Sequence, residues 1–471
     1  MRAKLVLSLL VASVVASARA AEPLRVGTFD VDASPPIGSP MAYNVTREVT
    51  TPLTCRGIVL IGKGKPIVLC AIDWIGVGND GNKVFREELA RAAKTTPDRV
   101  AVHALHQHDA PWCDLSVAAL VDQVGIRETI FDSPSARDVM RRSAQGVAKA
   151  IQEAQPVTHL GVGLGVVEQV ASSRRILGAD GKVKHVRYTA TADPAVRAYP
   201  EGVIDRNLKS ISFWNAEKKL VTLTYYATHP QSYYRTGQAN PDFPGLARNQ
   251  RQQATRVLHI HFNGAGGNIG AGKYNDGAHE NRQVLADRVA AGMTRAWDDE
   301  KKLPISAEDV DWKSVAVALP VAPHLDAAKL LEDVKNDQLP ASRRIQLAGE
   351  LVWLRRCQAG DTIDIGCLTL GSTRVLHMPG ELFVEYQLLA QQLRPDLFVA
   401  MAAYGDYAPW YIGTRVAYQQ GGYEPSPDAS LVAPDVEGVL VKAMQILLAA
   451  ENRVVEPLGV AAGKAEAAAA Q

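Results

Sequence analysis

The feature that most constrains the fold is the alternation of short apolar segments with longer amphipathic ones along most of the chain. Short apolar segments bounded by polar residues are typical of buried strands, and the longer segments carry the helical spacing of about 3.6 residues. The alternation predicts an α/β fold with a mixed β-sheet core flanked by helices. The expected strands span residues 57–61, 67–72, 99–104, 209–214, 220–226, 257–262, 374–377 and 397–402. The expected helices span residues 83–93, 136–154, 281–297, 382–392 and 436–450.

The N-terminal end departs from this pattern. Arg2 and Lys4 precede an apolar run over residues 5–15, and Ala18-Arg19-Ala20, with small residues at 18 and 20, follows. This order is typical of a secretory signal peptide over residues 1–20, because the apolar run is too short to span a bilayer. An uncleaved membrane anchor is the alternative. We expect a secreted or periplasmic protein that keeps no transmembrane anchor after cleavage.

The remaining chain is expected to form one domain and a tail. Residues 21–457 contain no repeat and no Ser/Pro-rich linker that would mark a domain boundary, whereas residues 458–471 are rich in alanine and predict a disordered tail. Lys and Arg number 51 against 50 Asp and Glu, so no net basic field favours a nucleic-acid partner. The sequence leaves the oligomeric state open.

The five cysteines bear on disulfides and on metal binding. Export permits disulfides, and an odd number of cysteines leaves at least one thiol unpaired within a chain. Cys357 and Cys367 flank a turn-rich segment and are the expected disulfide, with two free buried thiols as the alternative. Because the chain has no CxxC pair, a zinc site built from cysteines is not expected.

Polar residues follow several of the expected strands directly. His106 and His108 follow the strand at 99–104, and His229 follows the strand at 220–226. A glycine-rich run, Glu381 and Tyr411 follow later strands in the same way; that run spans residues 264–272. In open α/β sheets, ligands bind at the carboxyl ends of strands, so these segments are expected to form one site.

Each of these motifs is compatible with metal binding but is ambiguous alone. His106 and His108 are two residues apart, so on an extended segment both rings face the same side. Neutral imidazole is a common zinc ligand, although surface or core histidines are the alternative reading. Glu381 follows a Pro-Gly turn and is expected at a helix start, where the helix dipole favours a carboxylate. The chain contains neither the GxSxG motif of serine hydrolases nor the HExxH motif of metalloproteases.

Taken in chain order, the motifs resemble the neutral and alkaline (non-lysosomal) ceramidase family, and the likeness covers almost the whole chain after the signal peptide. The segments that carry the resemblance are VDASPPIG at 31–38, AID at 71–73, HQH at 106–108, SRR at 173–175, His229, DFPGLA at 242–247, PGE at 379–381, YIGT at 411–414, Tyr418 and YE at 423–424. The resemblance implies a catalytic domain over residues 21–457 with a zinc site at the strand ends.

The resemblance also implies roles for individual residues. One Zn²⁺ per chain is expected on His106, His229, Glu381 and Tyr411. His108 is expected to move protons, and Arg174 to stabilise the developing oxyanion. The residues expected to contact the substrate are Gly264, Gly266, Gly267, Asn268 and Asp242.

Two departures from the family pattern affect the expected reaction. Gly266 stands where the family has a serine proposed as nucleophile, and Gly264 replaces a nearby aspartate. The characterised ceramidases continue into a C-terminal β-sandwich domain, which we expect to be missing here. The expected activity is therefore hydrolysis of an amide by zinc-activated water, with ceramide or another small or lipid-like amide as substrate. The alternatives are the same zinc site acting on a non-ceramide amide, an ester or a sugar derivative, and a zinc-binding protein without catalysis.

Overall fold

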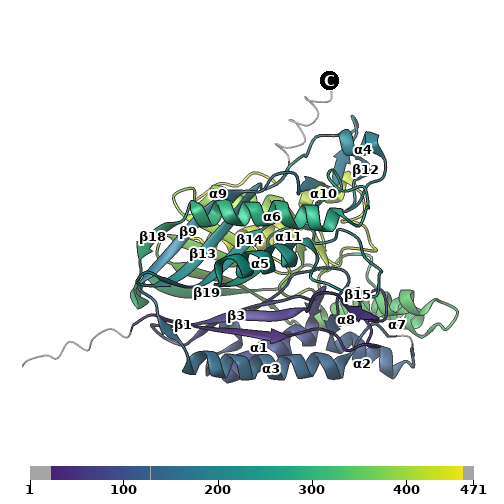
Figure 1. Ribbon diagram of the computed structural model, residues 1–471. Coiled ribbons are helices and arrows are strands. Elements are labelled where there is room, and N and C mark those ends of the chain that lie inside the picture. Colours follow the sequence, from purple (N-terminus) through teal and green to yellow (C-terminus); the bar gives the residue numbers. More distant parts are fainter. Residues whose placement is uncertain (1–22, 128, 460–471) are drawn as a thin grey trace, which may run out of the picture.

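The structure, a computed structural model, describes residues 23–127 and 129–459 (Figure 1). The expected signal peptide at residues 1–20 lies outside the described residues, as does most of the expected tail at residues 458–471. Leu458 lies inside them and is buried against the core, so ordered packing continues to the start of that tail. No helix of the described ranges is both long and apolar enough to cross a membrane.

Three larger sheets form the centre of the molecule. The first has the order β6-β4-β3-β1-β8 and consists of β1 (Arg25–Asp32), β3 (Thr54–Ile61), β4 (Ile67–Ile72), β6 (Val100–Ala104) and β8 (Gln155–Pro156). The second has the order β16-β14-β13-β9-β18 and consists of β9 (His159–Val166), β13 (Asn207–Asn215), β14 (Lys218–Tyr226), β16 (Leu258–Asn263) and β18 (Lys301–Pro304). The third has the order β19-β20-β21-β23 and consists of β19 (Val310–Val317), β20 (Ile363–Leu370), β21 (Thr373–His377) and β23 (Phe398–Ala402).

Short ladders and helices complete the fold. The short strands are β2 (Glu48–Val49), β5 (Gly76–Gly78), β7 (Trp112–Asp114), β10 (Ser172–Ser173), β11 (Arg175–Leu177), β12 (Val183–Val186), β15 (Gln238–Ala239), β17 (Ile269–Gly270), β22 (Glu381–Leu382) and β24 (Tyr411–Ile412). The helices are α1 (Asn79–Ala93), α2 (Leu115–Gln123), α3 (Ser133–Gln152), α4 (Pro194–Ala198), α5 (Asp242–Thr255), α6 (Asn281–Asp298), α7 (Ala327–Lys335), α8 (Ala341–Gln358), α9 (Val384–Leu393), α10 (Arg415–Gln420) and α11 (Val436–Leu447).

Each large sheet combines antiparallel strands with one parallel pair at its edge. The parallel pairs are β4 with β6, β14 with β16, and β21 with β23. Strand β4 is buried along its whole length, which explains why its sequence is a continuous apolar run without alternation. The arrangement confirms the predicted mixed α/β fold.

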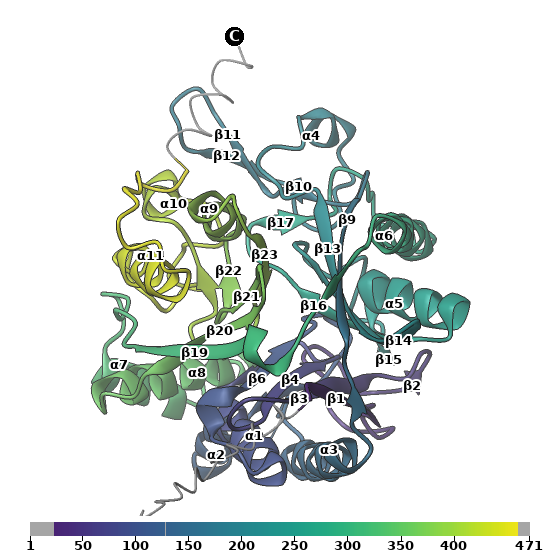
Figure 2. The same cartoon turned by 90° about the vertical axis from the view of Figure 1, so that its left-hand side faces the viewer.

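One hydrophobic core lies between the three sheets, and further cores lie between each sheet and its helices. The central core takes residues from every sheet, including Leu69, Phe213 and Leu368. Figure 2 shows the sheets around this centre with the helices outside them. Helices α1 and α3 cover the first sheet, α5 and α6 the second, and α9 and α11 the third. The edge strands β6, β16 and β23 are thereby brought together at the centre.

All the expected strands and helices are present, most of them with shifted ends. Several elements were not expected, among them β1, β9, β19, β20, α5 and α8. Strand β9 illustrates why. It is rich in glycine, which has a weak preference for strands. A Cβ atom added at Gly163 or Gly165 would overlap carbonyl oxygens of α6, so these glycines allow the helix to rest directly on the sheet.

The expected disulfide between Cys357 and Cys367 is not formed. All five cysteines are free in the described part of the chain. Cys367 lies within β20 and is buried in the core, whereas Cys357 lies near the end of α8 and is only partly buried. Nearness in the sequence does not give two cysteines the Cβ geometry that a disulfide needs. The sulfurs of Cys55 and Cys70, on neighbouring strands, lie 3.3 Å apart.

Candidate metal centre and active site

The candidate site lies where the carboxyl ends of the central edge strands meet. The backbone N–H of Ala104 donates to the carbonyl oxygen of Tyr404 at 2.9 Å, and that of Ala403 donates to Asn263 at 2.9 Å. These bonds hold together the segments that follow β6, β16 and β23. Polar residues after separate strands therefore converge on one place, as the sequence predicts.

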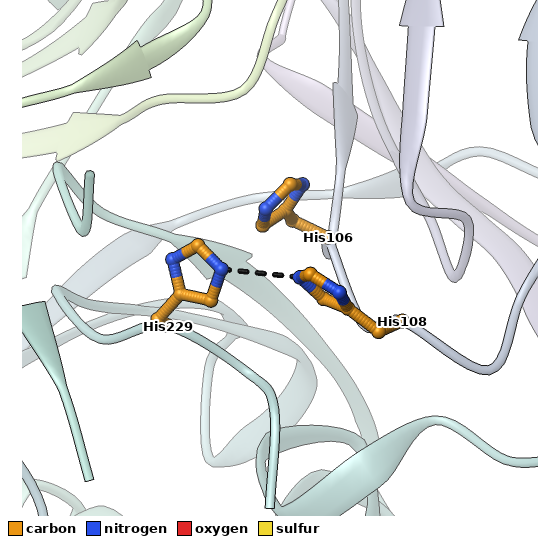
Figure 3. Close-up of side chains that lie close together, drawn as sticks. All are labelled: His106, His108 and His229. Carbon is orange, nitrogen blue, oxygen red and sulfur yellow. Dashed lines mark hydrogen bonds between the residues drawn. The ribbon is translucent and has the colours of Figure 1, made fainter. Parts of the chain in front are cut away.

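Three histidines gather at this place, and all three are buried. His106 and His108 follow β6, and His229 follows β14. Figure 3 shows the three rings close together. Each offers one ring nitrogen, and these atoms lie within 4.8 Å of one another. The Nε2 atoms of His108 and His229 are 3.1 Å apart. The cluster is thus compact enough to hold a metal ion.

Glu381 brings a carboxylate to the same cluster. Its Oε2 lies 3.2 Å from His106 Nε2 and 3.8 Å from His229 Nδ1. All three of these atoms are buried, and none has a hydrogen-bond partner in the described part of the chain. Buried polar atoms are rarely left unpaired, because desolvation without a partner is costly. Two nitrogens and one oxygen that converge in this way fit the donor set of a zinc ion.

The backbone around His106 explains how the two histidines come together. His106 has a left-handed backbone with φ of 74°, so the segment is not extended there, contrary to the sequence-based expectation. Its Nδ1 lies 2.6 Å from the carbonyl oxygen of Ile75, which assigns a proton to Nδ1 and directs Nε2 at the cluster. Such outer hydrogen bonds orient the histidines that ligate metals.

Glu381 is held in place by a tyrosine rather than by a helix. It lies in β22, and α9 begins only at Val384, so the expectation that Glu381 starts a helix was wrong. The Pro-Gly turn is followed by two residues that pair with β24 before the helix can begin. The hydroxyl of Tyr407 donates to Glu381 Oε1 at 2.7 Å, which leaves Oε2 directed at the histidines.

Tyr411 and Arg174 lie beside this cluster. Tyr411 is the register partner of Glu381 between β24 and β22. The guanidinium of Arg174 donates to the Tyr411 hydroxyl at 3.1 Å and lies 3.2 Å from the buried carboxylate of Glu424. Arg174 is therefore linked to the candidate metal centre indirectly, through the hydroxyl of Tyr411. Ligation by Tyr411 and oxyanion binding by Arg174 stay predictions.

Burial sets the protonation of the cluster. Burial is the main cause that holds the pKa of His108 and of His229 well below the ordinary histidine value, and the neighbouring His106 and Arg174 act in the same direction, so both rings are neutral. Burial by itself raises the pKa of Glu381, but the interactions with His106 and Tyr407 outweigh it and leave this pKa lowered. Neutral imidazoles and an ionised carboxylate are the forms that bind a metal.

Several residues of the site were not identified from the sequence. Gln231 donates from Nε2 to His108 Nδ1 at 3.1 Å, and Tyr43 stacks on the His108 ring at 5.4 Å. Tyr404 stacks on His106 at 4.4 Å. The only sequence signal was position: Gln231 lies two residues after His229, and Tyr404 and Tyr407 follow β23.

A cavity of about 740 Å³ opens beside the cluster and reaches His108 and Glu381. Aromatic side chains form much of its wall, and they are Tyr43, Trp112, Tyr407, Trp410, Tyr411 and Tyr423. A volume in this range suits a small-molecule ligand, and apolar walls with a few polar groups are typical of such sites.

None of the five residues expected to contact the substrate lines this cavity. The five expected residues are Gly264, Gly266, Gly267, Asn268 and Asp242. A Cβ atom at Gly266 would overlap the carbonyl oxygen of Thr228, and one at Gly267 would overlap that of Glu381. The glycine loop thus packs directly beneath two of the candidate ligands. Substrate contact by these residues stays a prediction.

The side chains of Asn268 and Asp242 also have structural partners. Asn268 accepts a hydrogen bond from the backbone N–H of Val384 at 2.9 Å and donates to Glu385. Asp242 accepts from the backbone N–H of Ser232 at 3.0 Å and lies 3.5 Å from Arg282. Both residues help to fix segments next to His229 and Glu381.

Comparisons with known proteins identify the fold. No family model and no curated protein sequence matches the chain. A solved structure of a ceramidase complexed with C2 matches with a TM-score of 0.64 and 15% identity, covering 91% of this chain and 75% of that one. The neutral ceramidase from Pseudomonas aeruginosa matches with a TM-score of 0.64 and 16% identity, covering 93% of this chain and 76% of that one. The chain therefore has the ceramidase fold, which the resemblance of its motifs predicts.

Proposed function

We propose that this protein is a zinc-dependent amidohydrolase of the neutral ceramidase type. The observation that carries the proposal is the convergence of three buried atoms, on His106, His229 and Glu381, for which residues 23–127 and 129–459 supply no hydrogen-bond partner. The fold shared with solved ceramidases supports the same reading. We further propose that the protein is exported, because of its signal-like N-terminus, and that residues 21–457 act as one catalytic domain.

The residues that would hold one Zn²⁺ per chain are His106, His229, Glu381 and, at the edge of the cavity, Tyr411. When bound, a zinc ion supplies Lewis acidity, which polarises a carbonyl group and makes water a better nucleophile at neutral pH. The neutral state of His229 and the ionised state of Glu381 favour metal binding, since neither ligand has to lose a proton first.

His108 is placed to transfer the proton in this reaction. Its ring lines the cavity, its pKa is low because it is buried, and Gln231 orients it. It takes the proton of the attacking water as the bond between water oxygen and carbonyl carbon forms. It then gives that proton to the amide nitrogen as the C–N bond breaks, which leaves a carboxylic acid and an amine.

Arg174 stabilises the negative charge that develops on the carbonyl oxygen. Its guanidinium is buried and bonded to the Tyr411 hydroxyl, so its charge acts in a site with little screening. The carboxylate of Glu424 lies 3.2 Å from Arg174 Nε and helps to keep the guanidinium in this orientation.

Water rather than a serine hydroxyl is the proposed nucleophile. Gly266 has no hydroxyl, and a Cβ atom at this position would overlap Thr228. The nearby serines are engaged elsewhere, because Ser232 Oγ accepts from Arg282 at 2.8 Å and Ser173 Oγ bonds to the backbone of Arg175. We therefore expect no acyl-enzyme adduct when the reaction of a slow substrate is quenched and examined by mass spectrometry.

Elemental analysis combined with amide hydrolysis tests the proposal. Purified protein is expected to contain about one zinc per chain and to lose turnover of fluorogenic amides with a chelator. His106→Ala and Glu381→Ala should lose both metal and turnover. His108→Ala should keep the metal and lose about a hundred- to ten-thousand-fold in turnover. His159→Ala, a histidine outside the cluster, is the matched control. Full zinc retention in both ligand variants would refute the assignment.

A further inference from the structure

Arg235 is a charged residue at the wall of the active-site cavity that the proposed reaction does not use. It lines the cavity together with His108, and its side chain is exposed. No carboxylate in the described ranges forms an ion pair with its guanidinium, whose neighbours are the rings of Tyr43 and Tyr234. An arginine with aromatic neighbours and no acidic partner is suited to bind an anion from solution.

The backbone of Arg235 is held in an unfavourable conformation. Its φ is 67°, a left-handed value that non-glycine residues rarely adopt. The backbone N–H of Arg235 donates to Asp109 at 2.9 Å, and the hydroxyl of Thr236 donates to the same carboxylate at 2.6 Å. Asp109 is buried and directly follows His108 in the chain. The turn that carries Arg235 is therefore anchored to the catalytic segment, and strain of this kind is concentrated at functional sites.

Stacked rings connect Arg235 to His108. The ring of Tyr43 lies parallel to that of His108, with centroids 5.4 Å apart and 3° between the planes. The guanidinium carbon of Arg235 lies 5.4 Å from the centre of Tyr43 and 5.3 Å from that of Tyr234. Tyr234 also contacts His108, at 5.1 Å. An anion bound by Arg235 would thus lie only one ring away from the residue that moves the proton.

Arg235 also differs from the other charges of the cavity. Arg343 lines the same cavity, but it lies 3.1 Å from Asp428 and 3.7 Å from Glu350, so acidic groups compensate its charge. Glu381 faces the histidines of the candidate metal centre. The positive charge of Arg235 is therefore available to bind an anionic ligand.

The rest of the cavity wall suits an apolar group. Trp112, Ile130, Ile345 and Trp410 line it, and its volume of about 740 Å³ leaves room for a chain beyond the scissile bond. Burial of methylene groups on such a surface contributes roughly 0.8 kcal/mol for each CH₂. The cavity thus offers one anion-binding group near the metal centre and an apolar wall beyond it.

We propose that the substrate is an N-acyl amino acid, with an apolar acyl chain on the cavity wall and a carboxylate bound by Arg235. This inference rests on the proposed amidohydrolase function and specifies its substrate class. It places the anionic group on the amine side of the scissile amide, a few bonds from the carbon that is attacked. A neutral amide of the same length lacks the group that Arg235 binds.

The test compares N-lauroylglycine with its neutral analogue N-lauroylglycinamide. The wild-type enzyme should show a higher kcat/KM for the carboxylate. Arg235→Gln should lower the ratio of the two kcat/KM values by about ten- to a hundred-fold, the range of a hydrogen bond to a charged group. Arg235→Lys should keep part of the preference, since it retains the charge without the planar fork.

Arg343→Gln is the matched control, because it removes a compensated arginine from the same cavity, and it should change the ratio by less than about threefold. A wild-type preference for the neutral amide, or an unchanged ratio in Arg235→Gln, would overturn the inference. If the wild type hydrolyses fluorogenic amides but neither of these compounds, the substrate inference is overturned and the proposed function stands. If it hydrolyses no amide at all, the proposed function fails, and titration calorimetry of both compounds then decides the role of Arg235. Tighter binding of N-lauroylglycine that Arg235→Gln abolishes supports the anion site, and equal affinities refute it.

Discussion

Replacing Gly266 with alanine is expected to disrupt the candidate metal centre from beneath. The added Cβ would overlap the carbonyl oxygen of Thr228 and lie 3.0 Å from the hydroxyl of Tyr404. The Thr228 carbonyl cannot move freely, since it accepts a hydrogen bond from Asn263 at 2.9 Å and precedes His229 directly. Overpacking of this kind typically costs about 1–3 kcal/mol. Because the obstacle is backbone rather than the tip of a side chain, we expect about 2–3 kcal/mol.

Two measurements check this prediction. Urea unfolding should give a free energy of unfolding lower by that amount, and elemental analysis should show less bound zinc, because His229 is displaced together with Thr228. Gly438→Ala is the control: it lies in α11, and a Cβ there meets no described atom within 4 Å. That variant should gain roughly 0.5–1 kcal/mol, as expected for alanine in place of glycine within a helix. A Gly266→Ala protein with wild-type stability and full zinc content would refute the reasoning.

Three further predictions follow from other parts of the structure. Tyr407→Phe removes the hydroxyl that holds Glu381 and should weaken zinc binding about ten- to a hundred-fold, measured by competition with a chelator, while thermal unfolding of the metal-free protein changes little. Cys357 alone should react with a thiol reagent in the native protein, and all five cysteines after unfolding; a native protein with several reactive thiols would contradict the burial of the others. Asp73 pairs with Arg248 at 2.7 Å. Burial raises the pKa of Asp73, but the charge and hydrogen bonds of Arg248 outweigh burial and leave this pKa lowered. The stabilisation from the pair is therefore present above the unfolded pKa of about 4 and is lost as the pH falls through the lower pKa of the folded state. Asp73→Asn should cost about 3–5 kcal/mol at pH 7, and the difference from wild type should shrink in acid; a constant difference between pH 7 and pH 3 would contradict the ion pair.

The sequence identified the strands around the site because their signal is local. Buried strands such as β4 are apolar throughout, and the polar residues His106, His229 and Glu381 follow strands within a few positions. The rule that ligands bind at the carboxyl ends of strands was then sufficient to group residues that are far apart in the chain. The family resemblance added the expectation that these residues bind a metal, and the fold comparison bears out that resemblance at the level of architecture.

Other features could not be predicted because their causes lie in distant segments. Gly163 and Gly165 weaken the strand signal of β9 in the sequence. In the structure they allow α6 to pack closely against this strand. The prediction that a helix begins at Glu381 was wrong, because Glu381 and Leu382 pair with β24 and α9 begins only at Val384. The prediction of a Cys357–Cys367 disulfide was wrong, because a short separation along the chain does not determine the direction of the two side chains.

The sequence by itself determined the fold class, the donor types available for a metal and the segments that carry them, since these follow from periodicity and from residue chemistry. Only the tertiary structure decided which donor atoms meet, and that a left-handed backbone at His106 directs its ring into the cluster. Only the structure, too, placed Arg235 beside Tyr43 with no acidic partner among the described residues. The reason is physical. Periodicity is a property of neighbouring residues, whereas the distance between His106 and Glu381 is set by how three sheets pack around a common core.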